Sequence, residues 1–314
     1  MAAALGGSLK KAQELEAKGE KALTKFSFFA SGSKFEEAAE LMNDAGKMYV
    51  MAKSYRDGGR TYERAAELHL KTKAEFDAGS SYTKAAEAWH KAEDMEKCAE
   101  AYEQAVAVYA GIGKCSMAAN NAKKLGDILE GQGDLRRAIE AFQQAIDLYE
   151  TEGRPQSASQ CRERAAFLSA DVGDLKEAQQ AFEEMGRASL QSNLGKFNAK
   201  KWFTNAVLCA LARTDTVAAS NKLVEFKAID YTLEGTREAQ LCEALVAACE
   251  SNDDAAVATA AADYDKIKRL DPWMTKLLLT IKSSVSPLDD DEATAAAPDG
   301  PPDADDAEDL PDLT

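Results

Sequence analysis

This sequence of 314 residues is poor in the groups from which catalytic and metal sites are built. It holds two histidines, His69 and His90, and neither has a cluster of cysteine or acidic partners beside it. A metal site or a Cys/His catalytic pair needs such partners. The six cysteines form no C-x-x-C pair and sit mostly at apolar helical positions, as small buried residues of a reducing compartment do. We therefore expect a protein that is not an enzyme and carries no cofactor.

Basic residues are the second shortage. Lys and Arg number 38 against 54 Asp and Glu, which gives a formal net charge of −16. General binding of nucleic acid requires basic surface that replaces counterions, so this balance argues against it. Eleven of the acids and no base lie in residues 289–314, and subtracting them from −16 leaves −5 for residues 1–288. The body of the protein is nearly balanced and can present basic patches.

Long apolar runs are missing as well. No stretch approaches the roughly 20 apolar residues of a transmembrane helix, and Met1–Leu5 lacks the length and the basic region of a signal peptide. A cytosolic protein is the default expectation. Aromatic residues make up 7% of the chain, and five of the seven prolines fall in the last 28 residues. The apolar content depends on alanine, the best helix former, which favours closely packed helices.

The body contains a 40-residue period. Aromatic residues recur at Tyr62, Tyr102, Phe142 and Phe182, and a second series repeats alanine at the same interval. The aromatic residues lie in segments that align without a gap, most clearly Asp94–Ala105, Asp134–Ala145 and Asp174–Met185. The alanine series consists of Ala38, Ala78, Ala118 and Ala158. Apolar positions at steps of three and four indicate two amphipathic helices per unit. Because such a hairpin has one apolar face, neighbours must stack, and we predict an all-α, right-handed α-solenoid of tetratricopeptide-like hairpins.

Three regions follow from the change in pattern along the chain. Residues 1–195 are predicted to form the hairpin array, with N-caps at Asp134 and Asp174. Residues 196–285 lose the period but are more apolar, which indicates a C-terminal helical bundle. Its expected helices are Ala199–Arg213, Thr216–Phe226, Thr236–Ser251, Asp254–Arg269 and Asp271–Ser283. Residues 286–314 are rich in Pro, Ala and Asp, have little to bury, and are expected to be disordered.

A hydrophobic loop is predicted at residues 26–33. The first helix is expected over about residues 8–25, and the second from Lys34, because Ser33-Lys-Phe-Glu36 has the form of a capping box. The loop holds Phe26, Phe28 and Phe29. They either fold back on the first hairpin as core or form a finger for a membrane or a partner. A partly inserted finger gives a weak, reversible anchor.

The order of these features resembles a known family. A short first helix, a Phe-Phe loop, tetratricopeptide-like pairs, a helical bundle and an acidic end are similar to the soluble N-ethylmaleimide-sensitive factor attachment proteins (SNAPs), closest to the alpha and beta kinds. The similarity is carried by Phe28–Ala38, Met51–Lys53, Ala65–Leu70, Ala145–Tyr149, Tyr264–Trp273 and Leu277–Lys282. The stretch from Tyr264 to Trp273 is the most specific of these.

The resemblance implies a function that the repeat alone does not. Members of the family are cytosolic, non-enzymatic adaptors that act at membranes. They surround a SNARE four-helix bundle in several copies and recruit the hexameric AAA+ ATPase NSF, which takes the bundle apart after membrane fusion. The chain alone is then expected to be a monomer, and the phenylalanine loop to make a weak membrane contact.

The resemblance also implies site residues. By alignment, basic positions that meet the SNARE bundle are Lys114, Arg164, Lys200 and Arg237. Asn120 and Gln160 stand where the family commonly has lysine, and Lys123 and Lys124, one helical turn beyond Asn120, are candidates to replace them; Lys123 is added to the set.

An acidic end is expected to meet the ATPase, because opposed charges speed docking and set orientation. Glu250, Asp253 and Asp254 lie in the corresponding helical turn. The near-terminal leucine of the family corresponds to Leu310 by its acidic context or to Leu313 by its place next to the end, and both interpretations stay open.

The competing prediction is a tetratricopeptide-type co-chaperone that binds a peptide, or a generic scaffold. The 40-residue period and the Tyr264–Trp273 stretch disfavour it. The sequence leaves open which SNAREs and which trafficking step are involved.

Overall fold

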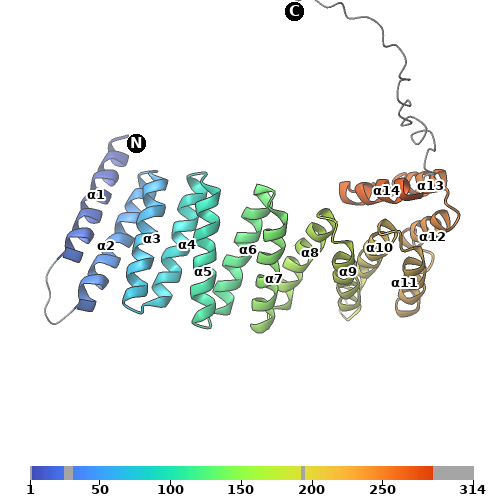
Figure 1. Ribbon diagram of the computed structural model, residues 1–314, viewed down its shortest axis with the longest axis horizontal. Helices are drawn as coiled ribbons and strands as arrows, with labels where there is room; N and C mark the ends of the chain where they lie inside the picture. Colours follow the sequence, from blue (N-terminus) through green and yellow to red (C-terminus); the bar gives the residue numbers. More distant parts are fainter. Residues whose placement is uncertain (1, 25–30, 192–194, 286–314) are drawn as a thin grey trace, which may run out of the picture.

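The computed structural model describes residues 2–24, 31–191 and 195–285, and these residues form fourteen α-helices and no strand (Figure 1). The helices are α1 Ala2–Thr24, α2 Ser31–Met51, α3 Tyr55–Lys71, α4 Glu75–Lys91, α5 Met95–Gly111, α6 Cys115–Gln132, α7 Leu135–Thr151, α8 Pro155–Asp171, α9 Leu175–Leu190, α10 Lys196–Ala212, α11 Thr216–Ile229, α12 Arg237–Glu250, α13 Asp254–Asp265 and α14 Pro272–Val285. The prediction of an all-α solenoid of helical hairpins is confirmed.

The period of the array is set by its turns. From α3 to α9, each helix begins 20 residues after the one before it, so a hairpin occupies 40 residues. A residue with positive φ recurs in the turns at the same spacing, at Lys53, Lys73, Glu93, Gly113, Gly133, Gly153 and Gly173. A residue with left-handed backbone angles just after a helix ends that helix, and glycine adopts these angles without strain. Four of these seven positions are glycine, which the sequence shows as regular punctuation.

The periodic residues form the core between helices. Phe142 and Phe182 are completely buried, and Tyr62 and Tyr102 nearly so. The alanine series is buried in the same way at Ala38, Ala78, Ala118 and Ala158. Small residues allow the helices to approach closely, and the aromatic ring of each period fills the space between them. Gly126 shows how tight the fit is, because a Cβ atom there would lie 2.8 Å from the Phe142 ring.

Side chains also join helices that lie two apart in the sequence. On the odd-numbered helices, Arg137 of α7 pairs with Glu103 of α5 at 2.7 Å. On the even-numbered helices, Lys124 of α6 pairs with Glu87 of α4 at 2.9 Å. Such contacts repeat along the chain at separations close to 38 residues. The stacked hairpins therefore present two layers, one of odd-numbered and one of even-numbered helices, along the row of helices in Figure 1.

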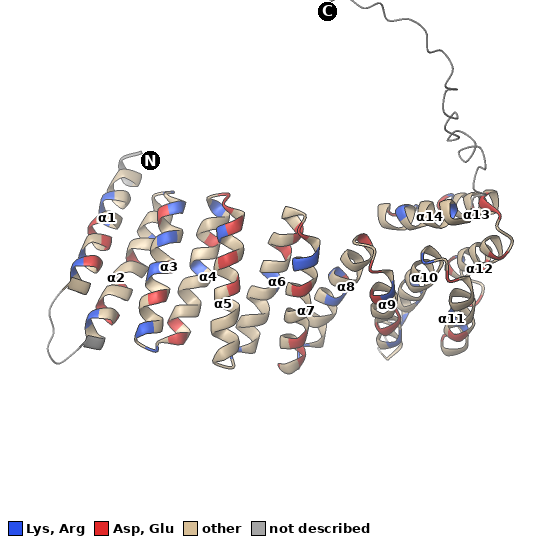
Figure 2. Cartoon of the chain, in the orientation of Figure 1, with Lys and Arg blue, Asp and Glu red and all other residues tan. Residues whose placement is uncertain are grey.

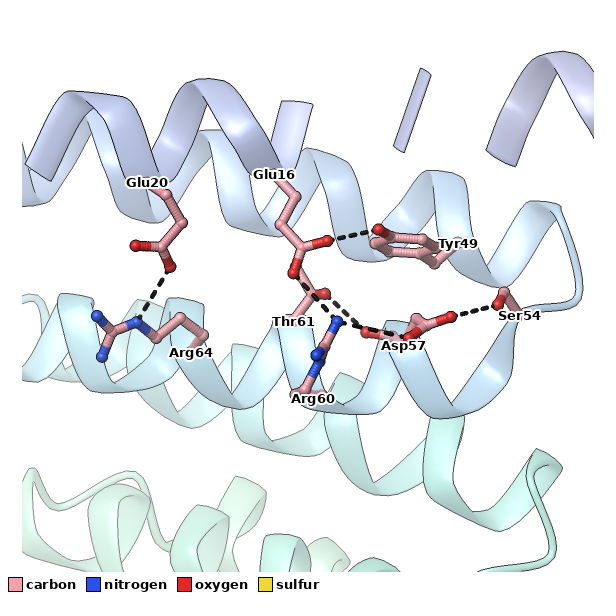
Figure 3. A network of polar contacts seen from close by, with 8 residues as sticks. All are labelled: Glu16, Glu20, Tyr49, Ser54, Asp57, Arg60, Thr61 and Arg64. Carbon is pink, nitrogen blue, oxygen red and sulfur yellow. Dashed lines mark hydrogen bonds and ion pairs between the residues drawn. The ribbon is translucent and has the colours of Figure 1, made fainter. Parts of the chain in front are cut away.

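The first helix is fixed to the array by a polar network (Figure 3). Glu16 of α1 accepts a hydrogen bond from the Tyr49 hydroxyl of α2 at 2.5 Å and pairs with Arg60 of α3 at 3.2 Å. Burial, followed by the bond to Glu16, raises the pKa of Tyr49, so the phenol keeps the proton that it donates. One turn further along α1, Glu20 pairs with Arg64 at 3.7 Å. These bonds position the C-terminal half of α1, the half that leads into residues 25–30.

The C-terminal helices join the array through α8 and α9. Helix α14 lies across the ends of its neighbours (Figure 1). Its Trp273 packs edge-on against Phe167 of α8 and Phe182 of α9, with ring centroids 4.9 and 5.4 Å away. Lys276 of α14 pairs with Asp171 of α8 at 2.7 Å. The most specific stretch of the sequence therefore ends in a residue that holds the last helix to the repeat array.

Several predicted boundaries are wrong. Helix α2 begins at Ser31, so Ser33 and Glu36 lie inside it and the capping box does not mark its start. Helix α1 begins at Ala2 rather than near residue 8, and α13 ends at Asp265 rather than Arg269. Glycine and serine lower helix propensity by about 1 kcal/mol or less per residue, which does not by itself end a helix, so they are weak boundary signals.

One of the two predicted aspartate caps is made. The Asp134 side chain accepts a hydrogen bond from the Arg137 backbone N–H at 3.4 Å. Asp174 stands at the N-cap of α9 but makes no side-chain cap bond. Its carboxylate accepts a hydrogen bond from Arg136 of α7 at 3.3 Å instead. A contact between repeats has replaced a local one.

The close packing at Gly126 can be tested by adding one methyl group. Gly126→Ala gains up to about 1 kcal/mol of helix propensity, but overpacking against Phe142 costs about 1–3 kcal/mol. We expect the free energy of unfolding to fall by about 1 kcal/mol. In the matched control Gly131→Ala, also in α6, the new Cβ meets no atom within 4 Å, and stability should rise. Urea unfolding measures both, and a stabilised Gly126→Ala protein would contradict the packing described above.

Candidate functional site

The histidine, cysteine and acidic side chains of the described residues form no candidate metal centre. Among these residues, no group of three or more His, Cys, Asp and Glu is placed to hold a metal ion. The cysteines are free thiols, and all except the half-buried Cys115 are buried. Burial raises the pKa of Cys98 to about 11 and that of Cys209 to about 12, so both stay protonated and are poor nucleophiles. No described helix is long and apolar enough to span a bilayer.

The two histidines differ from each other. His69 is buried and its ring contacts the Asn43 side chain at 2.9 Å, and burial lowers the pKa of this histidine. His90 is exposed on α4. Neither belongs to a group of three or more His, Cys, Asp and Glu residues of the described chain that could hold a metal ion.

The basic residues expected to meet a partner all belong to the even-numbered layer. Lys114 is the N-cap of α6, and Lys123 lies within the same helix. Arg164 lies on α8, Lys200 on α10, and Arg237 is the first residue of α12. Because α6, α8, α10 and α12 follow one another in that layer, the structure places five residues spread over 124 positions on successive helices of one side of the array.

These five side chains are not equally available. Lys114 and Arg237 are exposed and form no ion pair with another described residue. Arg164 pairs with Glu130 of α6 while keeping half of its side chain exposed. Lys200 pairs with Glu238 of α12 at 3.4 Å. An acidic partner meets two unpaired cations at once, and must share or displace an internal carboxylate to reach Arg164 and Lys200.

Glu238 is a neighbour of the predicted basic residues that the alignment did not indicate. Its side chain is 6% exposed and is held between Lys200 and Lys268, the latter at 3.2 Å. Burial opposes its charge, but a bond from its own backbone N–H and the two lysines together hold its pKa below the ordinary value. Its stabilisation is present above a pH of about 4.3 and is lost as the pH falls through the lower folded-state pKa. The signal was in the sequence, because Lys200 and Glu238 are separated by almost one period.

Lys123 and Lys124 point to opposite neighbours. The Lys123 ammonium donates a hydrogen bond to the Gln160 side chain of α8 at 3.2 Å. Lys123 thus brings its charge to one of the two positions where lysine was missing. Lys124 turns to Glu87 of α4. Asn120 has a structural role, because its side-chain oxygen accepts a hydrogen bond from the Tyr149 hydroxyl at 2.7 Å, which a lysine could not do.

The acidic residues expected to meet the ATPase share one turn. Glu250 is the last residue of α12 and is exposed. Asp253 is the N-cap of α13 and accepts a hydrogen bond from the Ala256 N–H at 2.8 Å. Asp254 opens α13 and lies 3.9 Å from the Lys282 ammonium of α14. Asp253 therefore stabilises the helix, whereas Glu250 projects from a helix end where a negative charge is locally unfavourable.

The remaining site residues lie outside the described part of the chain. These are Phe26, Phe28 and Phe29 and the terminal Leu310 and Leu313. Of the predicted loop at 26–33, residues 31–33 belong to α2.

Known proteins are similar to this chain over both the hairpin array and the C-terminal helices. The profile of the family "Soluble NSF attachment protein, SNAP" matches residues 10–286. An alpha-soluble NSF attachment protein of Vitis vinifera is 30% identical over 92% of this chain and all of its own length. A probable vesicular-fusion protein sec17 homolog of Schizosaccharomyces pombe is 34% identical over 85% of this chain and 92% of its own length. The alpha-soluble NSF attachment protein of Mus musculus is 29% identical over 84% and 89%. The chain belongs to the soluble NSF attachment protein family.

Proposed function

We propose that this protein is a non-enzymatic adaptor that attaches the ATPase NSF to assembled SNARE bundles in vesicle fusion. The family membership supports the attachment role, and the observation that carries the finer proposal is the line of basic residues on the even-numbered layer. A SNARE bundle is a long helical rod with acidic surface. A row of cations on successive helices suits such a rod, because many separated contacts can form along its length.

Binding to the rod is an exchange of partners in this proposal. Lys114 and Arg237 can contact the rod without breaking an existing ion pair. Arg164 must leave Glu130 or share its charge with it, and Lys200 must do the same with Glu238. The Arg164–Glu130 pair is partly exposed and contributes little to stability, so releasing it costs little. Glu238 is buried, but it keeps Lys268 as a partner when Lys200 turns to the rod. Each adaptor then binds weakly, and several copies around one bundle reach useful strength through avidity.

The other two contacts lie toward the ends of the chain. The turn with Glu250 and Asp254 faces the ATPase, and Leu310 or Leu313 stimulates it. The phenylalanine loop follows α1, whose C-terminal half the Glu16 and Glu20 network fixes to the array. A loop on a fixed support can add a weak membrane contact near the anchors of the bundle. In this proposal the protein works in the cytoplasm, peripheral on membranes, and does not bind nucleic acid.

The co-chaperone alternative has only the repeat in its favour. Tetratricopeptide-like hairpins serve many binding roles, and fold alone does not select one. The family match covers residues 10–286, which includes the C-terminal bundle.

Reversing one unpaired charge tests the SNARE surface. Lys114→Glu should weaken binding to a soluble, assembled SNARE complex about tenfold, or ~1.4 kcal/mol, because it replaces an attraction with a repulsion. Isothermal titration at low and high salt measures this, and the loss should shrink as salt rises. Lys176→Glu is the control, since Lys176 is exposed and, like Lys114, forms no ion pair with another described residue, but lies on α9 of the odd-numbered layer. Equal losses in both variants would refute the layer assignment. Lys200→Glu is a poorer test because it sets a carboxylate against buried Glu238.

The acidic turn can be tested without harm to the fold. Glu250→Lys puts a positive charge at the C-terminus of α12, where the helix dipole favours it, so the protein should stay folded. We expect recruitment of the ATPase to SNARE-bound protein to fall about tenfold, measured by pull-down across a concentration series. Glu184→Lys on α9 makes the same charge change at another exposed site and should leave recruitment intact. Normal recruitment by Glu250→Lys would exclude this turn.

The phenylalanine loop is tested by comparing two substrates. Replacing Phe28 and Phe29 with Ser should leave disassembly of soluble SNARE complexes unchanged. Disassembly of SNAREs anchored in liposomes should slow severalfold, because each lost Phe removes about 1.5–3 kcal/mol of burial when fully inserted. Variant and unmodified protein are compared by the rate of release of a labelled SNARE. Equal slowing on both substrates would mean that the phenylalanines belong to the core instead.

A further inference from the structure

The C-terminal helices carry an exposed groove that the adaptor proposal does not use. Two adjoining clefts of about 840 and 210 Å³ run along α13 and α14 and share Leu270, Thr275 and Leu279. The smaller cleft is lined mainly by apolar side chains, Val257, Ala258, Ala261 and Leu278 among them. Leu279 is 62% exposed in the middle of this surface. An apolar floor of this kind on a helix pair favours a partner with apolar side chains of its own.

The charged side chains that line the groove are all basic. They are Arg269, Lys276 and Lys282, and basic positions on α14 are visible in Figure 2. Lys276 pairs with Asp171 and Lys282 lies 3.9 Å from Asp254, while Arg269 is exposed. An ammonium has three donors, so a lysine that already has one partner can bind a further carboxylate. The groove therefore fits an acidic segment that carries leucine.

The same chain contains such a segment. Residues 308–314 read Glu-Asp-Leu-Pro-Asp-Leu-Thr, with three acids, two leucines and no base. They lie beyond residue 286, where the family match ends. Opposite charge and matching apolar groups point to these residues as the occupant of the groove.

The chain between α14 and residues 308–314 is long enough for these residues to reach the groove. Twenty-five positions separate Val285, the end of α14, from Leu310. A flexible linker of that length spans about 25–30 Å on average. Helix α14 has 14 residues and at 1.5 Å per residue is about 21 Å long. When the span of a linker is close to the distance between two sites, the local concentration of the tethered segment is highest.

We propose that residues 308–314 bind in the groove of α13 and α14, with Leu310 or Leu313 on Leu279 and the acids beside Arg269 and Lys276. The consequence for regulation rests on the proposed function. Leu310 and Leu313 are the residues assigned there to the ATPase, so the docked tail withholds them until the ATPase competes for it. The length of the acidic tail then serves to bring its end back to the bundle.

Disulfide trapping in the full chain tests the contact directly. The double variant Leu279→Cys with Leu313→Cys is oxidised by glutathione disulfide, and the intramolecular bond is followed by mass spectrometry. The control pair is Val224→Cys with Leu313→Cys, because Val224 on α11 is 67% exposed, close to the value for Leu279. We expect the Leu279 pair to form its bond at least about tenfold faster, since docking raises the local concentration of the tail.

Charge dependence separates docking from chance collision. Salt at 1 M reduces the Debye length to about 3 Å, so the faster rate should fall toward that of the control pair. Arg269→Glu in the Leu279 background should slow trapping severalfold at low salt. Three results would overturn the proposal. They are equal rates of bond formation for the two cysteine pairs, a rate for the Leu279 pair that changes neither with salt nor with Arg269→Glu, and disulfide-linked dimers in place of the intramolecular species. None of these readouts uses a SNARE or the ATPase, so failure here is distinct from failure of the adaptor function.

Discussion

The structure depends on the close approach of helices across alanine and glycine. The 20-residue spacing of the turns repeats the same contact, in which an aromatic ring of one helix fills the space that a small residue leaves on another. Each hairpin buries its apolar face only against its neighbours, so the array is stable as a stack and not as single units. A stack of this kind keeps its surface residues in register over a long distance, and that register is what a binding surface for a rod-shaped partner requires.

The same register explains the arrangement of charge. Residues one period apart lie on neighbouring helices of one layer, so opposite charges near 38 residues apart pair between repeats. Lys200 with Glu238 and Lys201 with Glu163 are examples. The result is a surface whose cations are partly neutralised by the protein's own carboxylates. A partner with acidic surface gains less from each contact than free cations would give, which suits a complex that must be taken apart after each round.

Much of the fold was readable from the sequence because the period is strict. Tyr62, Phe142 and the alanine series predicted the hairpins and their buried face. Helix starts were less predictable, as α2 shows, because serine and glycine lower helix propensity without necessarily ending a helix. The resemblance to the family named the basic residues, but neither their common place on the even-numbered layer nor their pairing with carboxylates could be predicted from the sequence. Whether Lys123 or Lys124 reaches Gln160 depends on one step of about 100° around α6, and only the structure decides it.

The claim that the protein attaches the ATPase to SNARE bundles is tested most directly by reconstitution. Purified chain, the ATPase NSF and a labelled SNARE complex are combined, and release of the labelled SNARE is followed after ATP is added. The account predicts ATP-dependent release that requires the chain and rises with its concentration. The account would be contradicted if the folded chain bound neither the SNARE complex nor the ATPase. It would also be contradicted if the labelled SNARE were released at the same rate with and without the chain.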